Sequence, residues 1–361
     1  MKTIKLSHEN IDNISVIGNE EQIAFDKKEL GENEKEKLEF NLYANARRYP
    51  KVKSLIVKLS NSGFYMTSHS DGKSIFSNYS NIESFQKNSN LDSKLRYKKL
   101  FYTLEPPEIK NKKNNLLVVF SSVSDFPYNA NIERRNFFEN FKTIRKYIPH
   151  NTYILRISDI GGVVGSFYLN NNFNDEVEST IQELLIKVSN DLSIENKDIV
   201  LYGVSKGGTA SLYHGILGGY KCVAVDPIVC DDYHQKNHND SHFTIGTFPQ
   251  SKKNKFTELM THDIHKNVNI IYSQNSPIFN DIETIIKSND KNNNINLFNI
   301  EHPKIKSHPD VGPNTINILM LIINNLFYEF YDGNANVRIK NEWPTSRKIL
   351  DHLIKAIKNK K

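Results

Sequence analysis

The amino-acid sequence predicts a doubly wound α/β fold built on a mostly parallel sheet. From about residue 97 onward, short apolar runs alternate with longer segments in which apolar residues recur every three or four positions. Strands that are apolar throughout are typical of a parallel sheet covered by helices on both faces. One of these runs ends at a serine flanked by glycines, LYGVSKGG, as expected where a strand turns sharply into a helix. We expect roughly six to eight strands in this sheet.

The expected elements alternate in order along the chain. The predicted strands cover residues 97–104, 116–120, 152–157, 198–202, 222–225, 268–272 and 295–300. The predicted helices cover residues 132–148, 177–192, a segment beginning at Gly207, and 316–330. Apolar residues of the helix over 177–192 share one face, which favours burial of that face against a sheet; they are Val177, Ile181, Leu184, Val188 and Leu192.

The two ends of the chain lack this alternation. Residues 1–95 are predicted to form a small α+β extension, either a subdomain or early strands added to the main sheet. It would hold a charged helix over 34–48 and short strands in the segment SLIVKLSNSGFYMTSHSDGKSIFS that follows. Residues 96–331 are the predicted α/β domain, and residues 332–361 are predicted to form a basic tail with one helix over 346–357.

Composition narrows the classes of function. The chain has 361 residues, of which 38% are hydrophobic, so it can bury a sizeable core. Its net charge of +6 is mild, and many of its lysines lie in loops. No basic stripe interleaved with aromatic residues is present, and we expect no nucleic-acid partner. The same charge is compatible with an anionic ligand such as a nucleotide, CoA or an acidic polysaccharide.

Cysteine content and apolar segments predict a cytoplasmic protein. Cys222 and Cys230 are the two cysteines of the sequence, and it contains no disulfide framework or CxxC site, which suits a reducing compartment. The first residues lack the apolar core of a signal peptide. The longest apolar stretch, residues 316–330, is interrupted by asparagines and a glutamate. We therefore expect no transmembrane segment.

The segment around Ser205 matches the nucleophile elbow of α/β-hydrolases. Gly203 and Gly207 stand two residues on either side of the serine, in the pattern G-x-S-x-G. Small residues at these positions allow the serine to adopt a strained positive φ angle, which leaves its hydroxyl exposed above the sheet. An ordinary tight strand-to-helix turn would account for the glycines as well. A catalytic role therefore depends on partners elsewhere in the chain.

A serine hydroxyl becomes a good nucleophile when an imidazole takes its proton and a carboxylate orients that imidazole. In α/β-hydrolases the chain order is serine, acid, histidine. The loop SQNSPIFND follows the strand over 268–272 and ends in Asp281, which we predict to be the acid. Asp226, directly after the strand over 222–225, is the alternative acid, and Glu283 is a third candidate.

His308 is the predicted general base, because it follows the last predicted strand and directly precedes the helix over 316–330. His302, closer to the end of that strand, is expected to orient the loop. His214 falls inside the helix after the elbow, where packing explains it better than catalysis does. Other histidines lack the spacing of metal ligands, so no metal site is predicted; they are His234, His238, His242, His262 and His265.

The tetrahedral oxyanion formed during acyl transfer needs backbone N–H donors. One is expected from Lys206, the residue after the nucleophile. The other is expected from the loop SSVSDF, which follows the strand over 116–120. The candidate donors in that loop are Ser121, Ser122 and Val123.

Three segments carry a resemblance to one branch of the α/β-hydrolase superfamily: VVFSSVSD, RISDIGGVVGSFYL and LYGVSKGG. Over roughly residues 97–330 the chain resembles the XcbB/CpsF family of capsular polysaccharide biosynthesis proteins. More distantly, it resembles the accessory Sec-system acetyltransferase subunit, which modifies sugars on adhesins. The resemblance implies a cytoplasmic serine-dependent O-acetyltransferase or esterase that serves surface-glycan synthesis. It also implies acetyl-CoA as acyl donor with no permanently bound cofactor, a glycan or sugar-nucleotide substrate, and other capsule-biosynthesis enzymes as candidate partners.

Two other functions remain open from the sequence. A general carboxylesterase or peptidase would use the same residues with water as the acceptor. A catalytically silent hydrolase-like scaffold in a capsule-assembly complex would need no triad, and the intact elbow at Ser205 argues against it. Asp159, which follows the strand over 152–157, would hold the oxyanion loop, contact a sugar hydroxyl, or cap the turn at Gly161 and Gly162.

Overall fold

The computed structural model describes residues 1–15, 19–264, 267–290, 294–328 and 336–339. Within these residues, nine strands form one sheet in the order β13-β12-β11-β10-β9-β7-β8-β6-β5. Four more strands form a second sheet in the order β1-β2-β4-β3. In the large sheet, neighbouring strands run parallel from β13 to β8 and antiparallel from β8 to β5.

The elements have the following bounds. The N-terminal extension contains β1 (Lys2–Lys5), β2 (Gln22–Asp26), α1 (Leu42–Ala46), α2 (Pro50–Asn61), β3 (Phe64–Ser70), β4 (Lys73–Asn78) and α3 (Ile82–Asn88). The large sheet contains β5 (Leu95–Tyr97), β6 (Leu100–Glu105), β7 (Asn115–Phe120), β8 (Thr152–Ile157), β9 (Ile199–Val204), β10 (Lys221–Val225), β11 (Val268–Tyr272), β12 (Ile295–Ile300) and β13 (Asn336–Ile339). The helices around it are α4 (Ile132–Asn136), α5 (Val177–Leu192), α6 (Lys206–Gly218), α7 (Asp232–Asn237), α8 (Lys252–Leu259), α9 (Phe279–Asp281), α10 (His308–Asn314) and α11 (Ile316–Tyr328).

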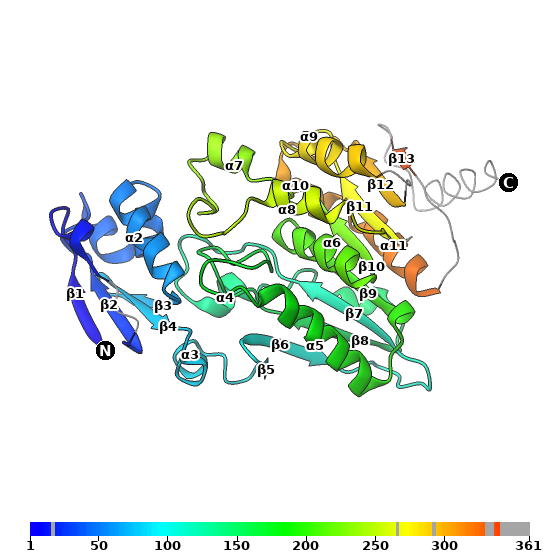
Figure 1. Ribbon diagram of the computed structural model, residues 1–361, viewed down its shortest axis with the longest axis horizontal. Coiled ribbons are helices and arrows are strands. Elements are labelled where there is room, and N and C mark those ends of the chain that lie inside the picture. Colours follow the sequence, from blue (N-terminus) through cyan, green and yellow to red (C-terminus); the bar gives the residue numbers. More distant parts are fainter. Residues whose placement is uncertain (16–18, 265–266, 291–293, 329–335, 340–361) are drawn as a thin grey trace.

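Alternate residues of the central strands belong to two separate hydrophobic cores. In β7, Leu116, Val118 and Phe120 pack with residues of α5 and α6 on one face of the sheet. Leu117 and Val119 pack with residues of α11 on the other face. Helices therefore cover both faces, as Figure 1 shows. The predicted doubly wound, mostly parallel α/β fold with an N-terminal extension is confirmed, with nine strands in the described sheet instead of the roughly six to eight expected.

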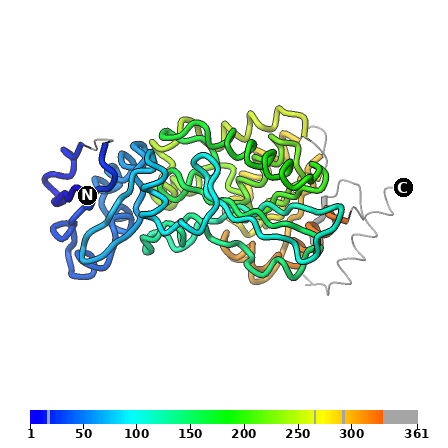
Figure 2. Tube along the Cα trace, turned by 90° about the horizontal axis from the view of Figure 1, so that it is seen from below, coloured from blue at the N-terminus to red at the C-terminus, as the bar shows by residue number. Residues whose placement is uncertain are grey.

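The N-terminal extension packs against one end of the α/β domain. Core residues of its own sheet, such as Phe25, belong to the same hydrophobic cluster as β7. In α2, Lys53 Nζ donates to the carbonyl oxygen of Asp240 at 3.2 Å, and Asn61 Nδ2 donates to that of Gly246 at 2.8 Å. Figures 1 and 2 place the extension at the end of the molecule opposite β12 and α11. The extension thus contacts the loop between α7 and α8.

The prediction of one helix over 132–148 is wrong. Only α4 and a later 3-10 turn, Ile144–Tyr147, are helical in this range. Between them, the buried Asn140 donates from Nδ2 to the carbonyl oxygen of Phe120 at 2.8 Å, and its own carbonyl accepts from Arg156 Nη1 at 3.0 Å. The backbone carbonyl of Asn140 is thus paired with a distant side chain, where a continuous helix would pair it with a backbone N–H four residues later.

In the N-terminal extension, the segment SLIVKLS is helical rather than extended. It lies in α2, which begins at Pro50. Proline is favourable at the first position of a helix, because a backbone N–H there would have no intrahelical acceptor. Val52, Ile56 and Leu59 are buried, and their spacing of three or four residues places them on one side of the helix. The charged helix predicted over 34–48 is divided into a short π-helical turn and α1.

Two further differences concern the edges of the large sheet. The strand predicted over 97–104 is a hairpin, since β5 and β6 pair antiparallel and Lys98 between them has a φ of 50°. At the opposite edge, β13 pairs parallel with β12, within the region predicted to be a helical tail. The helix predicted over 346–357 lies outside the described residues.

Candidate active site

Ser205 stands at the sharp turn between β9 and α6. Its φ of 56° and ψ of −118° lie outside the regions that an L-residue adopts without strain. Its N–H donates to the carbonyl oxygen of Val225 on the neighbouring strand at 2.8 Å. A Cβ on Gly203 would overlap the backbone of Gly207, and a Cβ on Gly207 would overlap the carbonyl group of Phe120. The glycines are therefore required by close backbone packing around the elbow.

His308 and Asp226 form a hydrogen-bonded chain with Ser205. The Ser205 hydroxyl donates to His308 Nε2 at 2.7 Å, and His308 Nδ1–H donates to Asp226 Oδ2 at 2.7 Å. The Asp226 carboxyl is fully buried, whereas the His308 side chain is 13% exposed. An ionised carboxylate can only accept, so it holds the imidazole proton on Nδ1 and leaves Nε2 to accept from the serine. This is the arrangement that makes a serine nucleophilic.

The order of the strands explains why Asp226 occupies this place. Asp226 directly follows β10, and β10 lies next to β9 with Val225 paired to Val204. Ser205 directly follows β9, so the acid and the serine leave adjacent strands at the same edge of the sheet. His308 begins α10, which follows β12 through a loop. Asp226 was the alternative acid in the sequence prediction.

The predicted contact between Asp281 and His308 is wrong. Asp281 lies at the end of α9, where it interacts with the thiol of Cys230. Burial and the nearby Asp232 carboxylate raise the pKa of Asp281. The loop that contains Asp281 supplies a hydroxyl instead, because Ser276 Oγ–H donates to Asp226 Oδ2 at 2.6 Å. The sequence offered no signal for Ser276, since a serine in a polar loop is unremarkable.

Lys206 places a backbone N–H beside Ser205 and buries its own side chain. Its N–H lies in the first turn of α6, where N–H groups have no intrahelical acceptor. Its ammonium group is fully buried, pairs with Asp159 Oδ2 at 3.0 Å and donates to the carbonyl oxygen of Val164 at 3.2 Å. Burial lowers the pKa of Lys206, and the charge of Asp159 opposes that effect. Asp159 also accepts from the N–H groups of Ser166 and Phe167 at 2.9 Å each, so it holds the loop after β8.

The SSVSDF loop retains two of its three candidate oxyanion donors. Ser121 N–H donates to the hydroxyl oxygen of Tyr168 at 2.6 Å. Tyr168 belongs to the loop after β8, which Asp159 holds. Ser121 is therefore committed elsewhere, contrary to the prediction. Ser122 lines a cavity together with Ser205, and its hydroxyl donates to the carbonyl oxygen of Val204 at 2.6 Å. This leaves the N–H groups of Ser122 and Val123 as the candidates.

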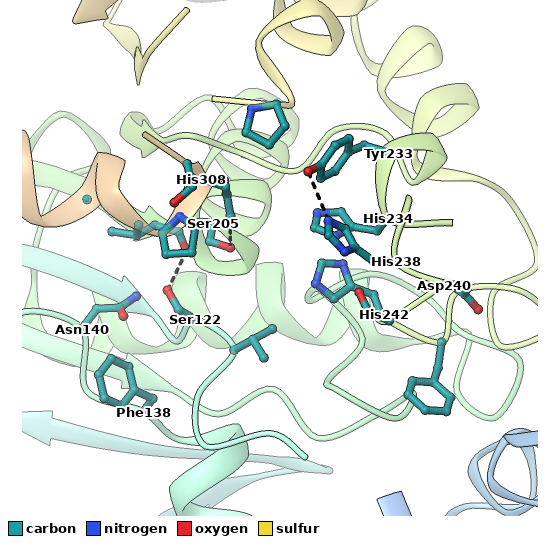
Figure 3. Close-up of a pocket in the computed structure, with 18 of the residues that line it drawn as sticks. Ser122, Phe138, Asn140, Ser205, Tyr233, His234, His238, Asp240, His242 and His308 are labelled. Carbon is teal, nitrogen blue, oxygen red and sulfur yellow. Dashed lines mark hydrogen bonds between the residues drawn. The ribbon is translucent and has the colours of Figure 1, made fainter. Parts of the chain in front are cut away.

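A cavity of about 1010 Å³ opens at Ser205. Its walls come from the elbow, α10, the interrupted segment after α4, the segment around α7, and the N-terminal extension. Figure 3 shows Ser205 and His308 on one side of it and three histidines across from them. Residues that line it include Arg47, Lys53, Ser122, Phe138, Asn140, Phe141, Tyr233, His234, His238 and His242. Its size suits a small-molecule substrate or a segment of a longer one.

The three histidines across the cavity follow one another at intervals of four residues. This spacing is not that of one helix face, because α7 ends at Asn237, and the sequence alone gives no signal that the three side chains meet at one cavity. Among the described residues, no three His, Cys, Asp or Glu side chains are placed to hold a metal ion. Of the other histidines in that prediction, His262 is exposed, and His265 lies outside the described residues.

The remaining sequence candidates make contacts away from Ser205. The imidazole of His302 accepts a backbone N–H within its own loop at 3.2 Å. Glu283 accepts from the hydroxyl of Tyr272 at 2.7 Å. His214 is buried in α6 and donates from Nε2 to a backbone carbonyl oxygen at 2.9 Å. Burial lowers the pKa of His214 to about 4, in keeping with the packing role expected for it.

No protein-family model matches this chain, and no curated protein matches it. Solved structures with a similar fold include the Glycosylation Associate Protein (Gap123) complex from Streptococcus agalactiae, with 16% identity and a TM-score of 0.45 over 65% of this chain and 46% of that chain. The capsule O-acetyltransferase of Neisseria meningitidis serogroup A has 17% identity and a TM-score of 0.46 over 64% and 94% of the two chains. The Staphylococcus aureus fluorophosphonate-binding serine hydrolase FphF has 13% identity and a TM-score of 0.44 over 62% and 92%. In the described part of this chain, no helix combines the length and apolar character needed to cross a bilayer.

Proposed function

We propose that this protein is a serine-dependent acyltransferase or esterase of the α/β-hydrolase type. Ser205 carries the acyl group, His308 transfers the proton, and Asp226 orients the imidazole. The observation that carries the proposal is the unbroken chain of two 2.7 Å hydrogen bonds that joins these side chains. The strained backbone of Ser205 supports it, because such strain persists mainly at functional sites.

In the acylation step, Ser205 Oγ attacks the carbonyl carbon of a bound ester or thioester while its proton moves to His308 Nε2. The carbonyl electron pair moves to the oxygen, where the N–H groups of Lys206 and of Ser122 or Val123 stabilise the negative charge. The tetrahedral adduct then collapses, and His308 gives the proton to the departing alcohol or thiol. The acyl group remains as an ester on Ser205.

Deacylation repeats these steps with a second nucleophile. A hydroxyl group of the acceptor gives its proton to His308 Nε2 and attacks the acyl-serine carbonyl carbon. Ser205 Oγ leaves and takes the proton back. Water as acceptor makes the protein an esterase, and a glycan hydroxyl makes it an O-acyltransferase. The cavity of about 1010 Å³ has room for an acceptor molecule next to the acyl group, as the second alternative requires.

We take the donor and the biological setting from the resemblance of the sequence to capsular polysaccharide biosynthesis proteins. The donor would be acetyl-CoA, and the acceptor a surface glycan or its sugar-nucleotide precursor. Arg47 supports a donor that carries phosphate groups, because it lines the same cavity. The Arg47 guanidinium is exposed and lies over the ring of Phe126, 5.5 Å from its centroid. A planar guanidinium on a ring is well placed to bind phosphate oxygens.

A fluorophosphonate probe tests the nucleophile. The wild-type protein should be labelled and Ser205→Ala should not, while Ser179→Ala, an exposed serine in α5, should be labelled like the wild type. Equal labelling of the wild type and Ser205→Ala would refute the proposal and favour a catalytically silent scaffold. Mass spectrometry of the capsule from a strain that lacks the gene tests the setting, and we expect an acetyl group to be missing from the glycan.

A further inference from the structure

Two imidazoles across the cavity have buried ring nitrogens without a hydrogen-bond partner. His234 is 8% exposed, and its Nε2 is buried; the Nδ1 of His242 is buried as well. Neither atom has a partner among the described residues. The two ring centroids are 3.9 Å apart, and both rings line the cavity at Ser205. Atoms this deeply buried are out of reach of a ligand, but the two rings themselves form part of the cavity wall, where a ligand can contact them. Polar side chains in a cavity wall fix the orientation of a ligand.

This pair of imidazoles lies close to the reacting groups. The ring centroid of His234 is 6.4 Å from that of His308. Figure 3 shows His234 and His242 facing the cavity opposite Ser205 and His308. A molecule that presents one hydroxyl to His308 can therefore reach His234 with another hydroxyl a few bonds away. Hydroxyl groups on a single sugar ring have this spacing.

Both imidazoles are neutral near pH 7. Burial lowers the pKa of His234 to about 4, with contributions from His308, His238 and Lys252 that Asp231 opposes. Burial also lowers the pKa of His242 far below its usual range, and His234, Lys252, His308 and Lys206 act in the same direction. A neutral imidazole has one N–H donor and one acceptor nitrogen. It is therefore suited to hydroxyl groups, which donate and accept, rather than to an anion, which only accepts.

Two carboxylates near these imidazoles, Asp240 in the cavity wall and Asp231 beside His234, are committed to other partners. Asp240 accepts from the N–H and the hydroxyl of Thr244 at 2.8 Å each, and Lys53 lies 3.7 Å away. Asp231 forms an ion pair with Lys252. These carboxylates cannot serve a metal ion together with the imidazoles without losing those bonds. A neutral polyhydroxylated ligand needs no such rearrangement.

The N-terminal extension holds the segment that carries these histidines. Lys53 donates to the carbonyl oxygens of Asn239 and Asp240, which lie between His238 and His242. Lys53 also lies over the ring of Phe243, 5.2 Å from its centroid. The extension therefore lines the cavity and supports the loop of His242. Support of this kind keeps the two rings in place in the cavity wall.

We propose that His234 and His242 form the acceptor subsite and bind two hydroxyl groups of a neutral carbohydrate, while a further hydroxyl of the same molecule faces His308. The proposal rests on the proposed function, because it assumes that Ser205 passes an acyl group to this acceptor. It assigns the specificity for the acceptor to these two imidazoles of the cavity wall, and it assigns the support of their loop to the N-terminal extension.

Direct binding tests the subsite without any chemistry. The full chain with Ser205→Ala is titrated with maltose, lactose and N,N′-diacetylchitobiose, and binding is measured by calorimetry and ligand-observed NMR. We expect at least one of these sugars to bind, and His234→Phe or His242→Phe to weaken that binding about tenfold each, as for the loss of one hydrogen bond. His234→Gln and His242→Asn keep a nitrogen near the lost one and should restore most of the affinity. His262→Phe, at an exposed site outside the cavity, is the matched control and should change nothing.

Three results would overturn the proposal. One is that none of the three sugars binds, or that the phenylalanine variants bind them as well as the parent protein. Another is that glucose 6-phosphate binds more tightly than the neutral sugars and binds more tightly as the pH falls, which would indicate an anion site that takes up protons. The third is that Zn²⁺ binds and is lost in the same variants, which would indicate a metal site. Thermal unfolding of every variant shows whether it is folded.

Acyl transfer separates this proposal from the proposed function. With 4-nitrophenyl acetate as donor, the wild type should form acetylated sugar as well as acetate, and His234→Phe should lower the ratio of sugar product to acetate. Suppose that neither the wild type nor any variant turns over the ester, while sugar binding still depends on the two histidines. The acyl-transfer function then fails and the carbohydrate subsite stands. If the ester is turned over but the ratio of sugar product to acetate is the same in the wild type and in both histidine variants, the subsite fails and the function stands.

Discussion

Replacing Asp226 with alanine tests the catalytic geometry with a matched control in the same chain, Asp281→Ala. Asp226 Oδ2 accepts from His308 Nδ1–H at 2.7 Å and from Ser276 Oγ–H at 2.6 Å. Alanine removes the acceptor of both donors. His308 then loses the group that selects its tautomer and that stabilises the imidazolium formed during the reaction. Ser205 and the imidazole can still meet, so some activity remains.

The expected loss is large but incomplete. When serine and histidine are present and the acid is missing, kcat falls by about 10,000- to 30,000-fold. That loss corresponds to about 5.5 to 6 kcal/mol of transition-state stabilisation. The folded state should tolerate the change, because Asp226 Oδ1 is buried without a hydrogen-bond partner and its removal offsets part of the two lost bonds. We therefore expect the melting temperature to change by no more than about 4 °C.

Hydrolysis of 4-nitrophenyl acetate under single-turnover and steady-state conditions measures the effect. Asp281→Ala should keep its rate within about threefold of the wild type, since its carboxyl contacts the Cys230 thiol and not the imidazole. The reasoning is refuted if Asp226→Ala keeps more than about a tenth of the wild-type rate. It is refuted as well if Asp281→Ala loses more activity than Asp226→Ala.

Three further predictions concern strain, buried charge and pH. Ser205→Gly should abolish activity. It should also raise the free energy of unfolding by about 1 kcal/mol, measured by urea denaturation, because glycine adopts the positive φ of 56° without strain. A variant that is less stable than the wild type would contradict this prediction. Asp159→Ala should lower the free energy of unfolding by about 3 to 5 kcal/mol, because it leaves the fully buried ammonium group of Lys206 without its counter-charge. A loss below about 1 kcal/mol, the value of an exposed ion pair, would argue against the buried pair. His214 and His234 have pKa values lowered to about 4, so the unfolded chain takes up their protons first as the pH falls. The free energy of unfolding should therefore be highest above about pH 6.5 and should decrease towards pH 4, by at most about 1.4 kcal/mol per pH unit for each histidine. Urea denaturation measures it, and a value that stays constant between about pH 7 and 5 would contradict the prediction.

Elements with a clear local pattern could be predicted from the sequence. The helix over 177–192 and the strands over 152–157, 268–272 and 295–300 were predicted with the bounds that the structure shows. Their patterns depend on residues close together in the chain, which a sequence displays directly. The helix predicted over 132–148 is interrupted, and within the gap the backbone carbonyl of Asn140 accepts from Arg156 of a distant strand. A local pattern contains no information about such a partner.

The amino-acid sequence by itself determined the alternation of buried strands and helices, the elbow at Ser205 and the place of His308 before the final helices. Each follows from periodicity, from glycine at a crowded turn, or from chain order. Only the tertiary structure decided between Asp226 and Asp281, because both follow a strand downstream of the serine and satisfy the same chain order. The adjacency of β10 and β9 brings Asp226 to the imidazole, and adjacency in a sheet depends on non-local pairing. The composition of the cavity wall likewise depends on the tertiary structure. The wall combines residues of the N-terminal extension with histidines far along the chain, and these come close to Ser205 only when the chain is folded.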